Sequence, residues 1–260
     1  MKKNYQRILF IAMFSLSTVI VSGQDSPVQF GGDFMSRYIW RGLNLGGNSP
    51  SIQPTLKLNL ATSNDVNAFT VGAWGAFSMS QLTAQEADLF VTYTFKQMIG
   101  LTVTDYFFPT DVASARNHYF DYNPSTTGHV LEGALSFNGT EKVPVTFMFA
   151  VNFYGADKRK LTADSTAGNL VYSKYMEVGY YTTIRGGVDL KGFVGAALDN
   201  PNKIYGGMGY YLNRSAGIVN VGVTASKKIP ITDKFVLPVQ SSLIFNPEAQ
   251  NIFIVFGFTL

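Results

Sequence analysis

Short segments in which apolar and polar residues alternate recur along almost the whole chain, and they restrict the folds that it can adopt. In SIQPTLKLNLAT, Leu56, Leu58 and Leu60 fall on one parity and polar residues occupy the other. In EADLFVTYTFK, Leu89 and Val91 continue the pattern. A period of two residues is that of a β-strand with two chemically different faces. Because the segments have about ten residues each and end in turn-forming sequence, we predict an all-β fold.

The first 23 residues do not share this alternation. A basic start, MKKNYQR, leads into fourteen largely apolar residues and then into Ser-Gly, which is the three-part plan of a secretory signal peptide. Fourteen residues are fewer than the roughly 20 that a helix needs to span a bilayer. We therefore predict a signal peptide over 1-23 and one barrel domain over 24-260.

A soluble sandwich and a transmembrane barrel both alternate, and they differ in whether the apolar face packs inward or meets lipid. The signal peptide, the even recurrence of the segments, and a composition of 46% hydrophobic and 14% charged residues favour the barrel. Aromatic residues gather near segment ends, as in interfacial girdles. Examples are Tyr38, Trp40, Tyr106, Phe107, Tyr180 and Phe258. We predict a transmembrane antiparallel up-and-down β-barrel surrounded by the lipid of a Gram-negative outer membrane.

The number of strands follows from the requirement that a single-chain barrel with both ends on one side has an even number. Twelve segments qualify, approximately 28-41, 50-62, 67-78, 85-97, 99-109, 128-138, 143-154, 172-184, 187-199, 217-228, 234-245 and 250-260. A thirteenth candidate, 203-212, would make the number odd and is predicted to be a loop. The register of 99-109 and the role of 203-212 stay open.

The connections between these segments sort by length. The connections 110-127, 155-171 and 200-216 are long and fall on one side, which is the extracellular side in barrels of this class. The turns near 63-66, 98, 139-142, 185-186 and 229-233 are short and fall on the periplasmic side.

Charged residues take the parity opposite to the apolar face. If 28-41 is one strand, Phe30, Phe34, Tyr38 and Trp40 face lipid, and the arginines between them face the lumen. A lipid-facing arginine at the bilayer midplane costs about 2–4 kcal/mol, which favours this assignment. The predicted lumen charge cluster is Arg37, Arg41, Glu86, Asp88, Glu132 and Glu177, with Asp33, Asp189 and Lys191 on the same inward parity.

The run S-R-Y-I-W-R-G, followed by P-S-I-Q at 50-53 and VGAWGAF at 71-77, resembles the start of the TorF-type porin family of outer-membrane barrels. The positions that match the family's motifs are Ser36, Tyr38, Arg41, Gly42, Pro50 and Gln53. The likeness extends from about residue 30 to the C-terminus. Pro54 and Leu260 depart from it, where the family has a small residue and an aromatic one. The resemblance implies a porin-like protein and says nothing about its substrate.

Nucleic acid is excluded as a partner by the charge balance. Three of the 20 basic residues precede residue 24, so the remaining 17 match the 17 acidic ones and leave no overall basic surface. The chain also has no cysteine, which excludes disulfides and thiolate metal sites.

Catalysis has little support in the sequence. Outer-membrane lipases and proteases need a histidine beside a nucleophile or an acid, and only His118 and His129 are present. His118 is expected to pack within a loop, and His129, on the parity of Leu131 and Leu135, is expected to point outward. There is no Gly-x-Ser-x-Gly and no His/Cys cluster. We predict no enzyme, no cofactor and no metal, with a lipase or protease as a minor alternative.

Two functions remain in competition. A barrel of twelve strands is intermediate between filled eight-stranded and open sixteen-stranded barrels, and inward aromatic residues are expected to narrow it further. These residues are Trp74, Phe90, Tyr175, Tyr181 and Phe193. The lumen charges suit a constriction through which small polar solutes diffuse, or a closed, salt-bridged lumen that stabilises a structural barrel. Neither the solute nor the oligomeric state has a signature in this sequence.

Overall fold

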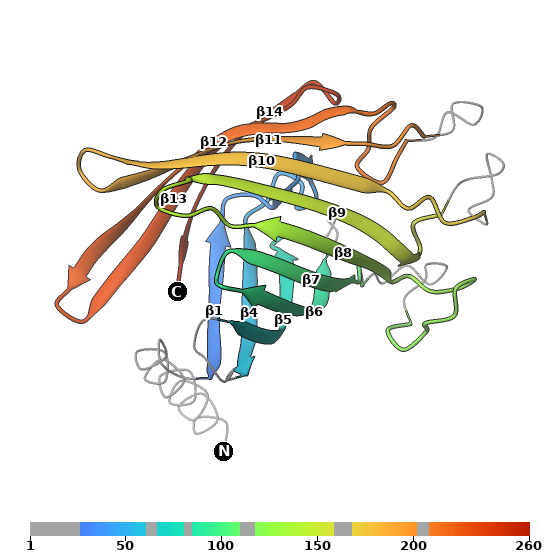
Figure 1. Cartoon of the computed structure of the whole chain (residues 1–260), viewed down its shortest axis with the longest axis horizontal. Coiled ribbons are helices and arrows are strands. Elements are labelled where there is room, and N and C mark those ends of the chain that lie inside the picture. The colour runs from blue at the N-terminus through green and yellow to red at the C-terminus, as the bar shows by residue number, and fades with distance from the viewer. Residues whose placement is uncertain (1–26, 61–66, 81–84, 110–117, 159–167, 202–207) are drawn as a thin grey trace, which may run out of the picture.

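Twelve antiparallel strands close into an up-and-down barrel in the computed structural model, which describes residues 27–60, 67–80, 85–109, 118–158, 168–201 and 208–260 (Figure 1). The predicted antiparallel up-and-down barrel and its strand number are therefore confirmed. The strands of the barrel are β1 (Val28–Met35), β4 (Ser51–Leu60), β5 (Ala68–Ser78), β6 (Glu86–Phe95), β7 (Ile99–Tyr106), β8 (Val130–Phe137), β9 (Val145–Gly155), β10 (Lys174–Ile184), β11 (Val188–Ala197), β12 (Gly217–Thr232), β13 (Phe235–Asn246) and β14 (Asn251–Thr259).

Each strand pairs with its neighbour in the chain, except where β1 closes the ring against β4 and β14. The three long connections all leave from one end of the barrel, here called the long-loop end. The other end, with tight turns such as Arg185–Gly187, is called the short-turn end. The predicted signal peptide lies outside the described residues, as do parts of all three long loops. In the part of the chain that is described, no helix has the length and apolar character to cross a bilayer.

Two details of the strand pattern could be assigned only from the structure. The register of β7 is fixed by its partners, with Phe95 opposite Ile99 on one side and Tyr106 opposite Val130 on the other. The predicted turn over 229-233 is wrong, because β12 continues to Thr232 and Asp233 with Lys234 forms the connection to β13. Of the extra candidate 203-212, only 208–212 are described, and they form no strand.

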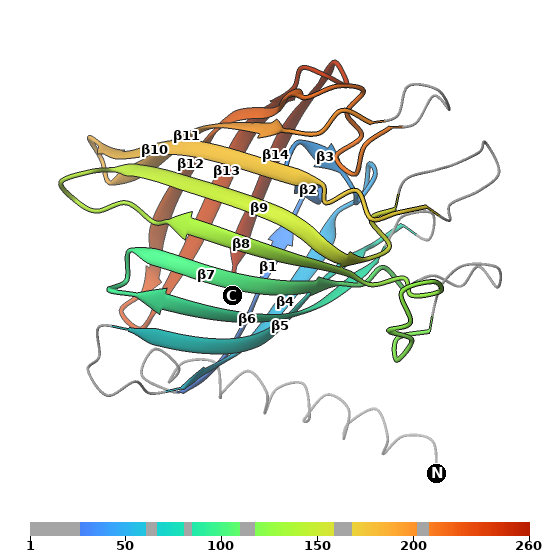
Figure 2. The same cartoon turned by 45° about the vertical axis from the view of Figure 1, so that its right-hand side comes forward.

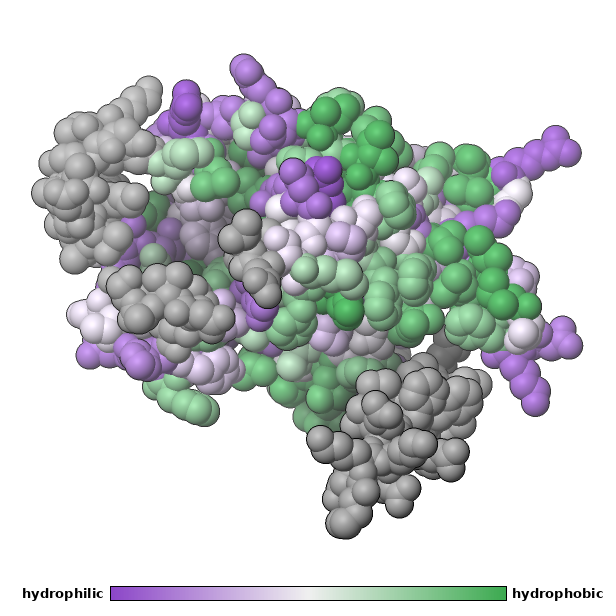
Figure 3. All heavy atoms as spheres, turned by 180° about the vertical axis from the view of Figure 1, so that it is seen from behind, coloured by the Kyte–Doolittle hydropathy of each residue, from purple (hydrophilic) through white to green (hydrophobic). Residues whose placement is uncertain are grey.

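The outer surface of the barrel is apolar. Side chains on the outward parity include Leu58, Leu89 and Ile254, and Ile254 is 68% exposed. Figure 3 shows hydrophobic residues over much of the middle of one face and hydrophilic residues gathered toward its two ends. Continuous exposed apolar surface of this extent is unusual on a soluble monomer and suits a lipid environment.

Two inward aromatic rings lie against the barrel wall, each over a glycine of the neighbouring strand. Phe90 is opposite Gly72 in the β5–β6 register, and a Cβ at Gly72 would lie 2.3 Å from the tip of that ring. Phe193 is opposite Gly222 in the same way, with a corresponding distance of 2.5 Å. The glycines thus give room for rings that would otherwise project toward the axis. The expectation that these aromatic residues narrow the lumen is wrong for Phe90 and Phe193.

The first predicted strand is also wrong at its far end, because β1 stops at Met35 and not at residue 41. The chain leaves the wall at Ser36 and enters the barrel, where β2 (Ile39–Trp40) pairs with β3 (Leu43–Asn44). Figure 2 shows this two-stranded sheet inside the ring of strands. We call residues 36–49 the inner hairpin.

A two-residue turn makes the inner hairpin possible. Arg41 and Gly42 connect β2 to β3 and have φ of 48° and 80°, which is the type I′ geometry that matches the twist of paired strands. Gly42 also touches the wall, since a Cβ there would lie 2.0 Å from the carbonyl oxygen of Val219 in β12. Glycine is therefore required at this position for both its backbone angle and its size.

Single cysteines test the two faces of the wall, because the native chain has none. Leu89→Cys is expected to react with a membrane-soluble maleimide in reconstituted protein and to resist a charged one. Lys191→Cys, on the inward parity of β11, is expected to react with the charged reagent. The comparison is made by mass shift after labelling in vesicles. Equal reactivity of the two variants toward both reagents would contradict a lipid-facing exterior.

Candidate functional site

Arg41, at the turn of the inner hairpin, binds Glu132 on β8. Its Nη1 lies 2.5 Å from Oε2 and its Nη2 lies 2.8 Å from Oε1, so the pair is bidentate. Glu132 is 2% exposed, and its Oε1 also accepts a hydrogen bond of 3.0 Å from the Tyr106 hydroxyl. Burial alone would lower the pKa of the Arg41 guanidinium, but the facing Glu132 carboxylate raises that pKa well above its usual value. The contact has the geometry of a buried salt bridge.

Aromatic rings surround this ion pair. The Arg41 guanidinium lies 4.5 Å from the ring centroid of Trp40 and 4.6 Å from that of Tyr175 on β10. Its Nη1 also donates to the Tyr211 hydroxyl at 3.1 Å, and the ring of Tyr211 stacks on Trp40. Cation–π contacts of this kind gain strength where water is excluded. The arginine is thus held by a carboxylate and by rings from three separate segments.

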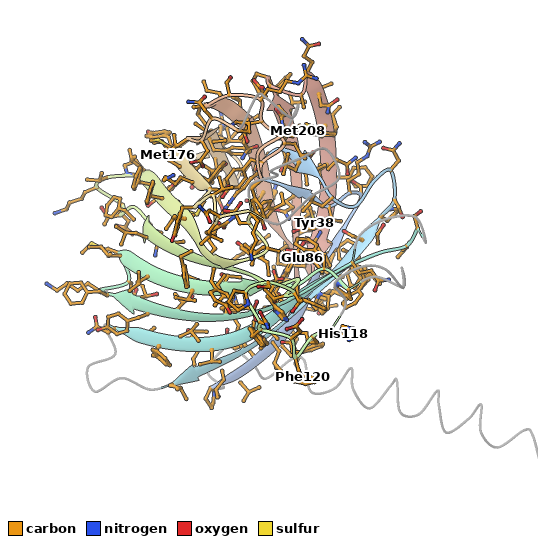
Figure 4. All side chains as sticks on the ribbon, turned by 90° about the vertical axis from the view of Figure 1, so that its right-hand side faces the viewer. Tyr38, Glu86, His118, Phe120, Met176 and Met208 are labelled. Atoms are coloured by element: carbon orange, nitrogen blue, oxygen red, sulfur yellow. The ribbon has the colours of Figure 1, made fainter. Side chains whose placement is uncertain are left out.

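A second contact anchors the hairpin to β6. The Tyr38 hydroxyl donates to Glu86 Oε2 at 2.8 Å, and its ring packs against Trp74 of β5. Figure 4 shows Tyr38 and Glu86 side by side near the middle of the molecule. Asp88, two residues further along β6, accepts a hydrogen bond of 3.3 Å from the Phe107 backbone N–H. Burial and the adjacent Glu86 raise the pKa of the Tyr38 hydroxyl, so it remains a donor.

The inner hairpin reaches the far wall as well. The carbonyl oxygen of Gly42 accepts a hydrogen bond of 3.1 Å from Asn246 of β13. Ile39 packs against the apolar cluster of Ile244, Phe253 and Val255, whose side chains come from β13 and β14. Contacts with β6, β8, β10, β12 and β13 show that the hairpin spans the lumen from one side to the other.

Of the remaining predicted lumen charges, Glu177 is connected to this network through Tyr175, and Arg37 lies outside it. Glu177 accepts hydrogen bonds from Tyr175 at 2.7 Å and from Asn220 at 3.0 Å, and Lys191 lies 3.9 Å away. Arg37 forms no hydrogen bond or ion pair with any described residue. The structure therefore brings Arg41 to Glu132 and places Glu86 beside Asp88, but it does not gather the six predicted residues into one cluster.

Exposure of the inward residues changes along the barrel. Near the long-loop end, Tyr175 of β10 and Ala197 of β11 are fully buried. Toward the short-turn end of the same strands, Thr183, Asp189 and Lys191 are exposed although they face inward. The lumen is therefore open to water on the short-turn side of the inner hairpin. We call this open part the vestibule.

His129 keeps the predicted outward parity of Leu131 and Leu135, and the β7–β8 loop covers it. It is fully buried, with Nδ1 2.8 Å from Asp105 and Nε2 2.6 Å from the Tyr119 carbonyl oxygen. The rings of Phe107 and Tyr122 stack on its imidazole. Its partner Asp105 lies opposite Leu131 on the same face of the sheet, and the register of β7 with β8 is unbroken there. Its backbone N–H donates to the Thr127 hydroxyl at 3.1 Å, and both ring nitrogens have partners, which fits the packing of the β7–β8 loop.

Several residues of the site were assigned to the membrane interface on sequence grounds. Tyr38, Trp40, Tyr106 and Phe107 were expected in an aromatic girdle. The structure places Tyr38, Trp40 and Tyr106 inside the barrel and buries Phe107 against Tyr119 and His129. Only Tyr180 and Phe258 of that set have exposed side chains. Tyr211, which completes the arginine site, had no sequence signal. The Arg-Gly pair between Trp40 and Leu43 was the signal for a turn. Two residues that include a glycine and stand between apolar residues suit the loop of a β-hairpin.

Comparison with known proteins gives a family but no activity. No curated protein matches the chain. The profile of a family described as "Bacterial protein of unknown function (Gcw_chp)" matches residues 22–194, which include the inner hairpin, Glu86, Glu132 and Glu177. The resemblance to TorF-type porins is not part of this finding and stays a prediction. On this match, the chain belongs to the Gcw_chp family of bacterial proteins.

Proposed function

We propose that the protein is a porin-like barrel of the bacterial outer membrane, in which small polar solutes diffuse through the lumen once the inner hairpin leaves the path open. The apolar exterior and the predicted signal peptide support the location. The inward charges support a polar route. As in other barrels of this class, the long loops would face the outside of the cell and the vestibule the periplasm.

The contrast between the two halves of the lumen carries this proposal. A barrel that serves only as a scaffold needs a filled interior, and at the level of the inner hairpin the interior is filled. The vestibule instead keeps inward Lys191 and Asp189 exposed to water, and glycines let Phe90 and Phe193 lie against its wall. An open polar vestibule that ends at a single segment crossing the lumen is the arrangement expected of a gated channel.

The structural alternative also has a specific observation in its favour. The bidentate contact between Arg41 and Glu132, closed in by Trp40, Tyr175 and Tyr211, resembles a permanent buried network more than a weak latch. In that case the hairpin is part of the fold and the lumen never opens. The two functions differ in what happens when the hairpin is removed.

Planar-bilayer recordings distinguish them. In the test variant, a Gly/Ser linker of equal length replaces 37–48, which removes the hairpin and leaves the twelve strands unchanged. We expect rare, small openings in the native protein and a steady conductance at least about tenfold larger in the variant, because a water-filled lumen replaces packed side chains. Arg214→Ala, which removes an exposed arginine at the long-loop end, is the control and should behave as the native protein does.

Two results would contradict the proposal. If the folded variant conducts no better than the native protein, the lumen is closed elsewhere and the structural function is favoured. If native protein and variant show the same steady conductance, the inner hairpin is not the barrier. The heat-resistant folded form on gels shows in both cases whether the barrel is intact.

A further inference from the structure

Two carboxyl groups lie side by side beneath the inner hairpin. Glu86 and Asp88 are two residues apart on the inward face of β6 and are 2% and 5% exposed. The Tyr38 hydroxyl donates to Glu86 Oε2, and the Phe107 backbone N–H donates to Asp88 Oδ1. Two buried carboxylates at neighbouring positions of one face repel each other, and one shared proton removes that repulsion. Burial in this conformation therefore favours a pair with one proton and one negative charge.

No positive group faces the pair among the described residues. Tyr38 of the inner hairpin and the Phe107 backbone N–H donate to it. The other titratable groups close enough to interact with it are Tyr106 and Asp105 of β7, Tyr119 and Tyr210. The arginine at this end of the lumen binds another acid, since Arg41 is paired with Glu132. A second negative charge at the pair would be buried without a counter-charge and next to a like charge, which is strongly unfavourable.

Tyr38 couples the pair to the inner hairpin. Its hydroxyl donates to Glu86, and its ring helps to cover the pair from the lumen together with Trp74. If the shared proton is lost, the two carboxylates repel each other and their hydration becomes the main source of relief. Water reaches them only if Tyr38 moves away from β6, and Tyr38 is part of the hairpin that fills the lumen.

We propose that the Glu86–Asp88 pair is a proton-binding latch, and that loss of its proton as the pH rises releases the Tyr38 side of the inner hairpin. The inference rests on the proposed function, because it names what regulates the same barrier. The direction follows from the charges. Protonation favours the closed hairpin, so closure is complete at low pH and is lost as the pH rises.

Tryptophan quenching reports this motion without any need for transport. The chain has two tryptophans, and Trp74→Phe leaves only Trp40 on the inner hairpin. In the refolded barrel with this change, we expect the acrylamide quenching constant of Trp40 to rise about twofold or more between roughly pH 5 and pH 9, as water and quencher reach the hairpin. Adding Asp88→Asn should keep the low value throughout, because an amide at this position carries no charge that could repel Glu86 at any pH.

Matched variants make the result decisive. Glu177→Gln removes another inward carboxylate of the lumen and should leave the pH dependence intact. Glu86→Gln serves as a second neutral variant if Asp88→Asn does not fold. A quenching constant that does not change with pH in the parent, or that changes equally in both neutral variants, would overturn the latch. A pH-dependent hairpin without conductance would overturn only the channel, and conductance gated by the hairpin at every pH would overturn only the latch.

Discussion

Replacing Arg41 with alanine is expected to lower the free energy of unfolding of the barrel by about 3–5 kcal/mol, because it leaves a buried carboxylate without its counter-charge. Glu132 would keep hydrogen bonds only from the Tyr106 and Tyr211 hydroxyls, which carry no charge. The contacts of the guanidinium with Trp40 and Tyr175 would be lost at the same time. Urea titration of the protein in detergent micelles, followed by tryptophan fluorescence, measures the change.

Arg37→Ala is the matched control, because Arg37 is the other arginine of the same segment and has no partner among the described residues. We expect it to change the free energy of unfolding by no more than about 0.5 kcal/mol. A second comparison, Arg41→Met with Glu132→Leu, removes both charges and should recover much of the loss, since neither charge is then left alone. An Arg41→Ala protein as stable as Arg37→Ala would show that the ion pair is not held as described.

Gly42→Ala is expected to displace the inner hairpin from its contact with β12. The new Cβ would lie 2.0 Å from the Val219 carbonyl oxygen, and the residue would also have to keep a φ of 80°. Positive φ costs a non-glycine residue about 1–3 kcal/mol, and a clash with backbone in the wall has to be relieved by movement of the hairpin itself. We therefore expect a loss of stability of about 2–4 kcal/mol together with increased conductance.

Gly186→Ala separates the effect of backbone strain from the effect of the clash with β12. Gly186 lies in the short turn between β10 and β11 with φ of 91°, and an added Cβ there meets no atom within 4 Å. This variant has the backbone strain without the clash, so it should lose about 1 kcal/mol and leave the conductance unchanged. If Gly42→Ala and Gly186→Ala behave alike, the close contact of the hairpin with β12 does not hold the hairpin in place.

The alternation of residues was sufficient to predict the barrel, because a wall with two chemically different faces imposes a period of two on every strand. The same period placed Glu86, Asp88 and Glu132 inside, where the structure also has them. These assignments depend only on neighbours within one strand and on the two faces of a sheet. Such information is local, and a sequence carries it directly.

The inner hairpin was decided by the tertiary structure. Alternation continues unbroken through Tyr38 and Trp40, since β2 and β3 are themselves extended, so the pattern does not show where the chain leaves the wall. Aromatic residues near a segment end have the same composition whether they meet a membrane interface or fill a lumen. Only contacts with distant segments distinguish the two environments.

The partner of Arg41 likewise separates what the sequence determined from what the tertiary structure decided. Parity gave Glu86, Asp88, Glu132 and Glu177 as acids that share the lumen with it, and the structure selects Glu132, which is 91 residues away in the chain. That choice depends on how far the hairpin enters the barrel, on the turn at Gly42 and on the position of Tyr211 in a long loop. The sequence determined which faces the charges take, because facing is a property of one strand. The closed chain determined which charges meet, because distance across a lumen depends on the positions of all twelve strands.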